Sequence, residues 1–376
     1  MDKSLRVMNL NLGDGRAGSG VFATALSKKL MQLGHSVIQG CSASSFTLRA
    51  AEKEKIPTHL INIQSLYEFE KAKQLAKFAN DHEIQVINAH HSGERYLAIF
   101  AKLLYKCKAK IVITRHAVSG TVPFFGTMIY NLGADMNIAV SDIVFQSLRR
   151  DFTFKKKIIY GGIDTDRFKT PDLNKIERLK KEIFKKDLHW PIIGMVADFD
   201  PEGKNTRGHG KGHSVLFDAI QYLRGKVSLL LIGPNSENCE PLLRIAKTKG
   251  IGEDQIFIIP FQEDIVPYYF LMDIHVLPSY SESLGLVTLE AMAAGVPCVG
   301  TNIGGINEII RHAKNGLLFS KGDSVDLSRQ INHLLDNTFL RKDLAKAGKD
   351  RVEQFFNMDR VGRETADLFH QLIENG

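Results

Sequence analysis

Short apolar runs alternate with longer amphipathic segments along this chain, and this alternation restricts the possible folds more than any other feature. Such a series forms strand–helix–strand units with parallel strands, because each amphipathic segment carries the chain back across the sheet. In the first half, the expected strands lie at residues 5–10, 35–40, 85–89, 110–114, 136–140 and 158–160.

The alternation starts again after residues 172–187, a charged segment of the kind that bridges domains. The strands expected in this second series lie at residues 191–196, 227–232, 255–259, 274–277 and 297–300. The sequence therefore predicts an α/β fold with two Rossmann-like, doubly wound parallel-sheet domains. We expect an N-terminal domain at 1–165, a linker at 166–188, a C-terminal domain at 189–355, and a final helix at 356–376 that packs back toward the N-terminal domain.

Composition is consistent with a folded protein of this kind. The chain has 376 residues, of which 44% are hydrophobic and 24% charged, values that argue against disorder. No apolar run approaches the roughly 20 residues that a membrane-spanning helix needs. The start, MDKSLRV, lacks the apolar core of a signal peptide, and the four cysteines show no metal-ligand spacing. We expect reduced cysteines and a cytoplasmic location.

Positive charge is concentrated in the first half. Residues 1–163 hold 22 Lys and Arg against 12 Asp and Glu, whereas the remainder holds 27 against 30. One interpretation is a lysine-rich surface that keeps the protein dispersed. The other is attraction toward an anionic acceptor or the inner face of an anionic membrane, with 102–110 and 155–157 as candidate basic patches. Nucleic acid is a poorer partner, because no basic stretch carries interleaved aromatic residues.

Open parallel sheets bind ligands beyond the carboxyl ends of their strands, so the chemistry is expected just after each strand. The most specific such stretch, SYSESLGLVTLEAMAAGVPCVGTNIGGINE at 279–308, follows the expected strand at 274–277. Seven residues separate Glu282 from Glu290, and a helix is expected to begin between them. One interpretation is an exposed loop acid and a helix-face acid. The other is a ligand site, with Glu282 at a sugar and Glu290 accepting hydrogen bonds from ribose.

The start of that helix suits a diphosphate, because unpaired N–H groups and the helix dipole both favour an anion there. The backbone groups expected to point at it belong to Leu284, Gly285, Leu286 and Val287.

This stretch resembles the signature of the large retaining glycosyltransferase family 4, also called glycosyltransferase group 1, whose fold is GT-B. The family motif of two glutamates, E-x7-E, matches Glu282 and Glu290. The following TNIGGINEII resembles the family's T-x-x-GG-x-x-E-I-I/V. Further family-like pieces are the glycine-rich loop at 13–20, the strand end at His116, YGGIDTDRF and MDIHVLPS. The resemblance implies that Glu282 contacts the donor sugar and Glu290 the ribose.

The family usually carries an Arg and then a Lys-Gly pair after the first strand of its second domain. Lys211 and Gly212 match the pair, so the resemblance implies that Lys211 is a cation for the donor diphosphate. Asp198 stands at the usual Arg position, and a glycine-rich insertion at 202–210 separates it from Lys211. Arg207, within that insertion, either replaces the missing cation or is a solvated loop residue.

In the first domain, the loop NLGDGRAGSG at 11–20 is neither a P-loop nor a regular dinucleotide fingerprint. Within the resemblance, Gly18, Ser19 and Gly20 match the loop that closes over the donor phosphates and the acceptor. Arg16 is a candidate contact for an anionic acceptor.

Histidines end two expected strands of that domain. His116 ends IVITRH, and the family often has His there, near the donor sugar and the attacking oxygen. We expect a neutral imidazole that hydrogen-bonds a sugar hydroxyl; a capped loop histidine is the alternative. His90 and His91 end VINAHH and are expected to contact the acceptor.

The resemblance implies a retaining hexosyltransferase that moves a sugar, most often from a UDP-linked donor, to a glycan or lipid-linked acceptor. Lipopolysaccharide or other cell-surface polysaccharide synthesis is the expected setting. No cofactor or metal is expected, since the nucleotide-sugar is a substrate and the fold neutralises the leaving diphosphate with cations and a helix dipole. A sugar-nucleotide epimerase or phosphorylase, and a non-catalytic nucleotide-sugar-binding protein on the same fold, remain open alternatives.

Overall fold

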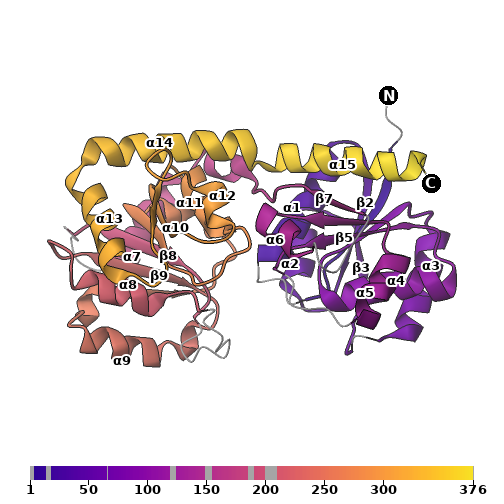
Figure 1. Cartoon of the computed structure of the whole chain (residues 1–376), viewed down its shortest axis with the longest axis horizontal. Coiled ribbons are helices and arrows are strands. Elements are labelled where there is room, and N and C mark those ends of the chain that lie inside the picture. Colours follow the sequence, from indigo (N-terminus) through magenta and orange to yellow (C-terminus); the bar gives the residue numbers. More distant parts are fainter. Residues whose placement is uncertain are drawn as a thin grey trace. The chain divides into compact units, whose positions relative to one another are not determined.

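The computed structural model describes residues 4–13, 18–65, 67–118, 124–148, 155–184, 190–199 and 210–375. Arg16 and Arg207 lie outside these ranges. The chain divides into two compact units (Figure 1). Unit 1 comprises Met1–Ile163 and Asn357–Gly376, and unit 2 comprises Asp164–Phe356.

Unit 1 contains a seven-stranded parallel sheet in the order β3-β2-β1-β4-β5-β6-β7. Its strands are β1 (Arg6–Leu10), β2 (Ser36–Cys41), β3 (Thr58–Leu60), β4 (Val86–Ala89), β5 (Lys110–Arg115), β6 (Met136–Ala139) and β7 (Lys156–Ile158). Its helices are α1 (Gly18–Gln32), α2 (Phe46–Lys53), α3 (Phe69–Asp81), α4 (Ser92–Tyr105), α5 (Phe124–Gly133), α6 (Asp142–Ser147) and α15 (Met358–Glu374).

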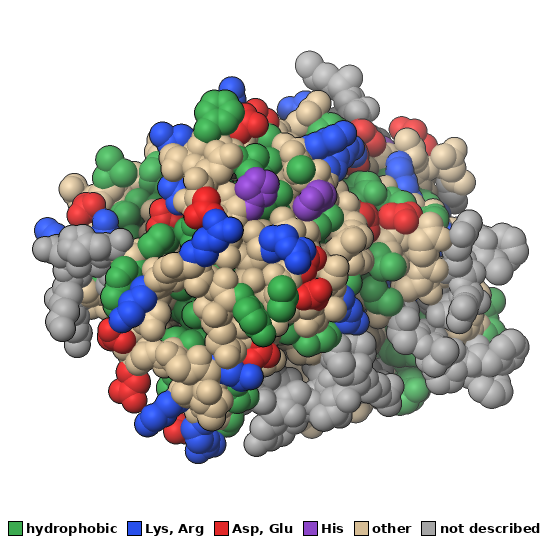
Figure 2. Space-filling model, turned by 60° about the vertical axis from the view of Figure 1, so that its left-hand side comes forward, with side chains coloured by type: hydrophobic (Ala, Val, Ile, Leu, Met, Phe, Trp, Pro, Cys, Tyr) green, Lys and Arg blue, Asp and Glu red, His purple; other side chains and the backbone are tan. Residues whose placement is uncertain are grey.

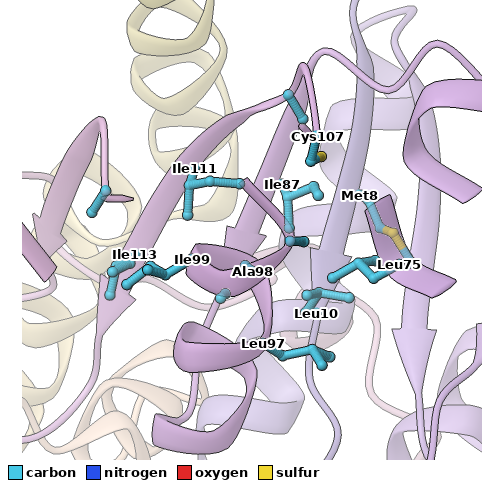
Figure 3. Packing of buried hydrophobic residues seen from close by; sticks show 14 of the residues in the cluster. Met8, Leu10, Leu75, Ile87, Leu97, Ala98, Ile99, Cys107, Ile111 and Ile113 are labelled. Carbon is cyan, nitrogen blue, oxygen red and sulfur yellow. The ribbon is translucent and has the colours of Figure 1, made fainter. Parts of the chain in front are cut away.

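Both faces of this sheet are covered, which explains why its strands are almost continuously apolar. On one face, Leu10, Ile87 and Ile113 pack with Leu75 of α3 and Leu97 of α4 (Figure 3). The opposite face packs against α1 and α15, and its buried cluster includes Val7, Val86, Val112, Leu26, Leu30 and Phe369. The last helix of the chain thus completes the core of unit 1, as its yellow ribbon shows (Figure 1).

Unit 2 contains a six-stranded parallel sheet in the order β10-β9-β8-β11-β12-β13. Its strands are β8 (Ile192–Val196), β9 (Ser228–Gly233), β10 (Ile256–Pro260), β11 (Ile274–Leu277), β12 (Cys298–Thr301) and β13 (Leu317–Phe319). Its α-helices are α7 (Leu173–Phe184), α8 (His213–Ile220), α9 (Glu240–Thr248), α10 (Val266–Tyr269), α11 (Leu286–Ala293), α12 (Ile306–Ile309), α13 (Ser324–Asp336) and α14 (Thr338–Phe355). Short 3₁₀ helices are η1 (Thr165–Phe168), η2 (Ser236–Asn238) and η3 (Glu253–Gln255).

The predicted α/β class with two doubly wound parallel sheets is confirmed. Two strands were not expected, β3 and β13, each only three residues long. The segment expected at 166–188 as a linker falls within the bounds of unit 2. There η1 and α7 belong to the unit, and Phe184 is buried with its ring centroid 4.7 Å from that of Phe257.

In both sheets the strand order reverses beside the first strand, between β1 and β4 in unit 1 and between β8 and β11 in unit 2. Connections leave the two sides of this point in opposite directions, and doubly wound sheets bind their ligands there, beyond the carboxyl ends of the strands. We therefore expect the functional residues in the loops that follow β1 and β4, and in those that follow β8 and β11.

The charge difference between the halves of the sequence persists between the units, with 24 Lys and Arg against 16 Asp and Glu in unit 1 and 25 against 26 in unit 2. Part of the positive charge is already engaged, since Lys102 forms an ion pair with Asp135. Figure 2, which turns the left-hand side of Figure 1 forward, shows acidic and basic side chains interspersed. Among the residues that the structure describes, no helix is both long and apolar enough to cross a membrane.

One core position of unit 2 is unexpectedly polar. His275, in the middle of β11, is fully buried, and neither ring nitrogen has a hydrogen-bond partner among the described residues. Its ring centroid lies 6.0 Å from that of Tyr269. Burial lowers the pKa of His275 to about 3. The native state therefore binds fewer protons than the unfolded chain between about pH 3 and the ordinary pKa of 6.5.

We predict that His275→Leu removes one acid-sensitive contribution to stability. Because unfolding lets His275 take up a proton, the wild-type free energy of unfolding should fall by up to about 1.4 kcal/mol per pH unit below pH ~6.5 through this residue alone. The stability difference between His275→Leu and wild type should thus grow as pH falls from 7 to 5 in urea titrations. Exposed His333→Leu is the matched control. A difference that stays constant with pH would contradict the prediction.

Candidate functional site

In unit 2, the loop that follows β11 carries the first predicted acid. Ser279 is fully buried, and its hydroxyl donates to Oε1 of Glu282 at 2.9 Å. The same oxygen lies 2.6 Å from Nζ of Lys211, which ends the loop after β8. The structure therefore brings together Lys211 and Glu282, which are 71 residues apart in the sequence. A cation and a carboxylate meet where the strand order reverses.

The two loops approach so closely because of glycine. Gly212 has φ +81°, and a Cβ there would lie 2.0 Å from the carbonyl oxygen of Pro278. Just before it, the carbonyl of Gly210 accepts a hydrogen bond from the Tyr280 N–H at 3.1 Å. Any larger residue at 212 would push the loop after β8 away from the loop after β11. The Lys-Gly pair thus serves geometry as well as charge.

The glycine pair after β12 supports the same loop from its other side. The Gly305 N–H donates to the Glu282 carbonyl at 3.1 Å. A Cβ on Gly305 would lie 2.3 Å from the Ser283 carbonyl oxygen, and one on Gly304 would lie 2.5 Å from the Glu282 carbonyl oxygen. The TNIGG sequence therefore allows the backbone to pack directly against the loop that holds Glu282.

Three residues beyond Glu282, the chain enters α11. Gly285 adopts a left-handed conformation with φ +95° at the helix N-cap, and Leu284 before it is buried. Leu286 and Val287 open the first turn, where a helix leaves its N–H groups without intrahelical partners. These groups and the helix dipole make the start of α11 suitable for an anion.

Glu290 lies one turn further along α11. The hydroxyl of Tyr269 donates to its Oε2 at 2.8 Å. Burial raises the pKa of Glu290, whereas the Tyr269 hydrogen bond and the positive charge of Arg167 lower it. Neither Tyr269 nor Arg167 was expected at the site. Arg167 falls within the family-like YGGIDTDRF segment, but no local pattern marks Tyr269.

Asp198, which stands at the usual Arg position, accepts a hydrogen bond from Asn235 Nδ2 at 2.6 Å. The partner follows β9, so this contact joins the loops after two neighbouring strands, β8 and β9. The carboxylate at 198 thus binds a neighbouring loop.

In unit 1, the loop residues after β1 and β4 are in contact. Ser19 of α1 lies with its hydroxyl oxygen 3.0 Å from Nε2 of His91. Gly18 begins α1, and Gly20 is buried in its first turn. The predicted Gly18-Ser19-Gly20 stretch and His91 therefore belong to one cluster.

A buried glutamate, Glu94, fastens these loops. Its carboxylate accepts hydrogen bonds from the backbone N–H groups of Leu12, His90 at 3.1 Å and His91 at 2.9 Å. Burial raises the pKa of Glu94 to about 7, and the three N–H donors oppose that rise. Sequence reasoning missed this residue, although a glutamate three positions after the helix N-cap is a capping-box signal.

His90 and His116 follow the neighbouring strands β4 and β5 and meet directly. Nδ1 of His90 lies 2.8 Å from Nε2 of His116, and the rings stack with centroids 5.1 Å apart. Phe22 packs edge-on against His116 at 5.1 Å. Burial, with the nearby His91 and Arg95, lowers the pKa of His116 to about 3, and burial also lowers that of His90. Both rings are therefore neutral at neutral pH.

The described part of the chain contains no cluster of three His, Cys, Asp or Glu side chains arranged to hold a metal ion. Lys211, the start of α11 and, beside Glu290, Arg167 are positive features of the unit 2 site.

Known proteins resemble this chain along most of its length. Residues 204–351 match the model of glycosyl transferases group 1, and residues 16–167 match that of Glycosyltransferase Family 4. N-acetyl-alpha-D-glucosaminyl L-malate synthase of Bacillus anthracis is 26% identical over an alignment 374 residues long that covers 95% of each chain.

Two solved structures share the fold, GT-B. A glycosyltransferase from Rickettsia africae ESF-5 superposes with a TM-score of 0.85, at 21% identity over the whole of both chains. The HepE protein of Anabaena, solved with UDP and glucose, gives a TM-score of 0.82 at 19% identity, over 98% of this chain and 100% of that one.

We predict that Gly305→Ala strains the Glu282 loop. The added methyl would overlap the backbone of Ser283 and Leu284, so it should lower the free energy of unfolding by about 1–3 kcal/mol. Gly225→Ala is the matched control, because a Cβ there meets nothing within 4 Å. Urea unfolding of both variants measures the effect. Equal midpoints for Gly305→Ala, Gly225→Ala and wild type would show that the close contact is not needed.

Proposed function

The chain belongs to glycosyltransferase family 4, and we propose on this premise that it transfers a hexosyl group from a UDP-sugar to an anionic acceptor with retention of anomeric configuration. The observation that carries this proposal is the Lys211–Glu282 pair, whose glutamate lies four residues before Leu286, the first residue of α11. The site lies beyond the carboxyl ends of β8 and β11, where doubly wound sheets bind nucleotides.

The donor would bring negative charge to this pair. We assign the diphosphate to Lys211 and to the N–H groups of Leu284, Gly285, Leu286 and Val287. Lys211 now neutralises Glu282, and a bound diphosphate would take over that cation. Glu282 would then be available for the hydroxyls of the donor sugar. In the second acid, Glu290, Oε2 already accepts a hydrogen bond from the Tyr269 hydroxyl, and Oε1 would accept one from a ribose hydroxyl.

The same positive groups would assist bond breaking. Negative charge grows on the diphosphate as its bond to the sugar C1 breaks, and preorganised donors stabilise that charge. The acceptor oxygen would form its bond to C1 from the face that the diphosphate leaves, and the acceptor proton would pass to the departing phosphate oxygen. Such a transfer retains configuration. We propose that it needs no divalent metal, since Lys211 and the start of α11 supply the positive charge.

The acceptor is proposed to be anionic for two reasons. Unit 1 carries the excess of Lys and Arg, and the full-length relative from Bacillus anthracis is named for a product containing L-malate, a dicarboxylate. Ser19 and His91 are the proposed contacts on this side, whereas both ring nitrogens of the buried His90 are engaged by Asn88 and His116. A free carboxylate and a lipid-linked phosphate share the recognised feature, an anion beside a hydroxyl. The expected role in cell-surface polysaccharide synthesis corresponds to the lipid-linked source.

Transfer assays test this proposal directly. UDP-glucose and UDP-N-acetylglucosamine would be incubated with L-malate, with its uncharged dimethyl ester, or with a short-chain lipid-linked sugar phosphate, whose sugar supplies the hydroxyl and whose phosphate supplies the charge. We expect UDP release that requires an anionic acceptor, an α-linked product by proton NMR, and unchanged rates with a metal chelator. The acceptor that reacts shows whether the anion recognised is a free carboxylate or a lipid-linked phosphate.

Several outcomes would overturn parts of the proposal. A β-linked product would exclude retention, and inactivation by the chelator would exclude metal-independent transfer. Equal reaction of malate and its dimethyl ester would exclude recognition of charge. An isomerised sugar nucleotide in the absence of any acceptor would identify an epimerase.

For the donor site, we predict that Lys211→Ala weakens UDP binding by about 10–100-fold, because it removes a charge-assisted contact to phosphate. Uridine, which lacks the diphosphate, should bind within about twofold of wild type. Isothermal titration of both ligands measures this, with exposed Lys314→Ala as the control for loss of a unit 2 lysine. Equal weakening of UDP and uridine would remove Lys211 from the diphosphate.

A further inference from the structure

A row of buried polar side chains crosses three strands of unit 1. Gln39 of β2 is the register partner of Asn9 of β1, and Asn9 is the register partner of Asn88 of β4. All three are fully buried. Ser27 of α1 and Thr114 of β5 join the row through hydrogen bonds, and His90 and His116 end it. Nothing in the donor site explains this row.

The direction of every hydrogen bond in the row follows from one backbone carbonyl. Gln39 Nε2 lies 3.1 Å from the Asn9 carbonyl oxygen, which can only accept, so the Gln39 amide is oriented. Its Oε1 must then accept the Ser27 hydroxyl proton, at 2.6 Å. Ser27 has no second proton, so its oxygen accepts from Asn9 Nδ2 at 2.8 Å. Asn9 therefore turns Oδ1 toward Asn88.

The same logic continues to the histidines. Asn88 gives one Nδ2 proton to Asn9 Oδ1 at 3.0 Å and its other to His90 Nε2 at 3.3 Å, while its Oδ1 accepts from Thr114 at 2.7 Å. His90 Nε2 is then an acceptor, so the proton of this neutral ring is on Nδ1. That proton points to Nε2 of His116, 2.8 Å away. His116 must in turn carry its own proton on Nδ1.

We propose that Asn9, Ser27, Gln39, Asn88 and Thr114 are positioning residues that fix the tautomer of the His90–His116 pair, so that His116 presents Nδ1–H as a donor to a substrate oxygen. This inference rests on the proposed function for the identity of that substrate. A ring held in this tautomer donates through Nδ1 and cannot accept a proton there. His116 thus orients and polarises a sugar or acceptor oxygen and is not the general base.

The row is a two-state system, which makes the proposal testable. If the Asn9 amide turns over, Asn88 must turn as well, and its Oδ1 then faces His90 Nε2. His90 Nε2 becomes the donor, Nδ1 accepts from His116 Nε2–H, and Nδ1 of His116 is left bare. Ser27→Ala removes the group that prevents this turn, although Ser27 lies three hydrogen bonds away from His90 along the row.

Long-range ¹H–¹⁵N correlation spectra of the full chain distinguish protonated from bare ring nitrogens. His90→Asn and His116→Asn identify the two sets of signals. In wild type we expect protonated Nδ1 and bare Nε2 in both rings. Ser27→Ala and Asn88→Leu should each shift part of the His116 population to protonated Nε2 and lower kcat by roughly tenfold, the loss expected when a hydrogen bond is misdirected. Ser27→Ala, the smaller change, keeps the test valid if Asn88→Leu fails to fold.

Thr47→Val is the matched control. Thr47 is a buried residue of unit 1 whose hydroxyl donates to Asn11 Oδ1 at 3.2 Å, outside the row, so the tautomers should be unchanged. Protonated Nε2 on His116 in wild type, or unchanged tautomers in both Ser27→Ala and Asn88→Leu, would overturn the proposal. These spectra need no substrate. The expected tautomers in a protein without transfer activity would therefore refute the proposed function and leave the assigned tautomer standing.

Discussion

The reversal of strand order beside the first strand is the constraint on which both sites depend. Each sheet is parallel, so the loops that follow its strands all lie at the carboxyl ends of the strands, and their polar groups gather there. At the reversal of strand order, neighbouring loops leave the sheet in opposite directions, which is where doubly wound sheets bind ligands. Glycine then closes the remaining gaps, because Gly212 and Gly305 let backbone touch backbone around the Glu282 loop.

The two units place different kinds of side chain at the carboxyl ends of their strands. Unit 2 relies on charge, with a lysine, a carboxylate and a helix start in sequence, and such a site suits a polyanion. Unit 1 relies on neutral groups, since burial keeps His90 and His116 uncharged and the row of buried polar side chains ends at them. A neutral hydrogen-bond donor selects a ligand by the direction of the hydrogen bond, whereas a cation attracts any anion. A transferase has use for both, one for the leaving group and one for the reacting oxygens.

Sequence periodicity predicted the fold class and most strands, since buried strands such as β1 and β11 are short apolar runs that alternate with amphipathic segments. It missed β3 and β13, whose three residues are too few to show a period. The family motif located Glu282, Glu290 and Lys211, but their roles stay predictions, as does contact with a membrane. Tyr269, Ser27 and Asn9 were missed because their partners lie on other elements. Two missed residues had a signal in the sequence: Glu94 through its position relative to a helix start, and Arg167 through the YGGIDTDRF segment.

The position of α15 has a consequence for biosynthesis. This last helix covers the sheet face that contains Val7, Val86 and Val112, while every residue of unit 2 is contiguous in the chain. On the ribosome, unit 2 can finish folding before α15 has emerged, but unit 1, although translated first, has only α1 on this apolar face until then, so that part of the face stays uncovered. The N-terminal unit is therefore the later of the two to become complete, and its exposed face is a natural target for chaperones during translation.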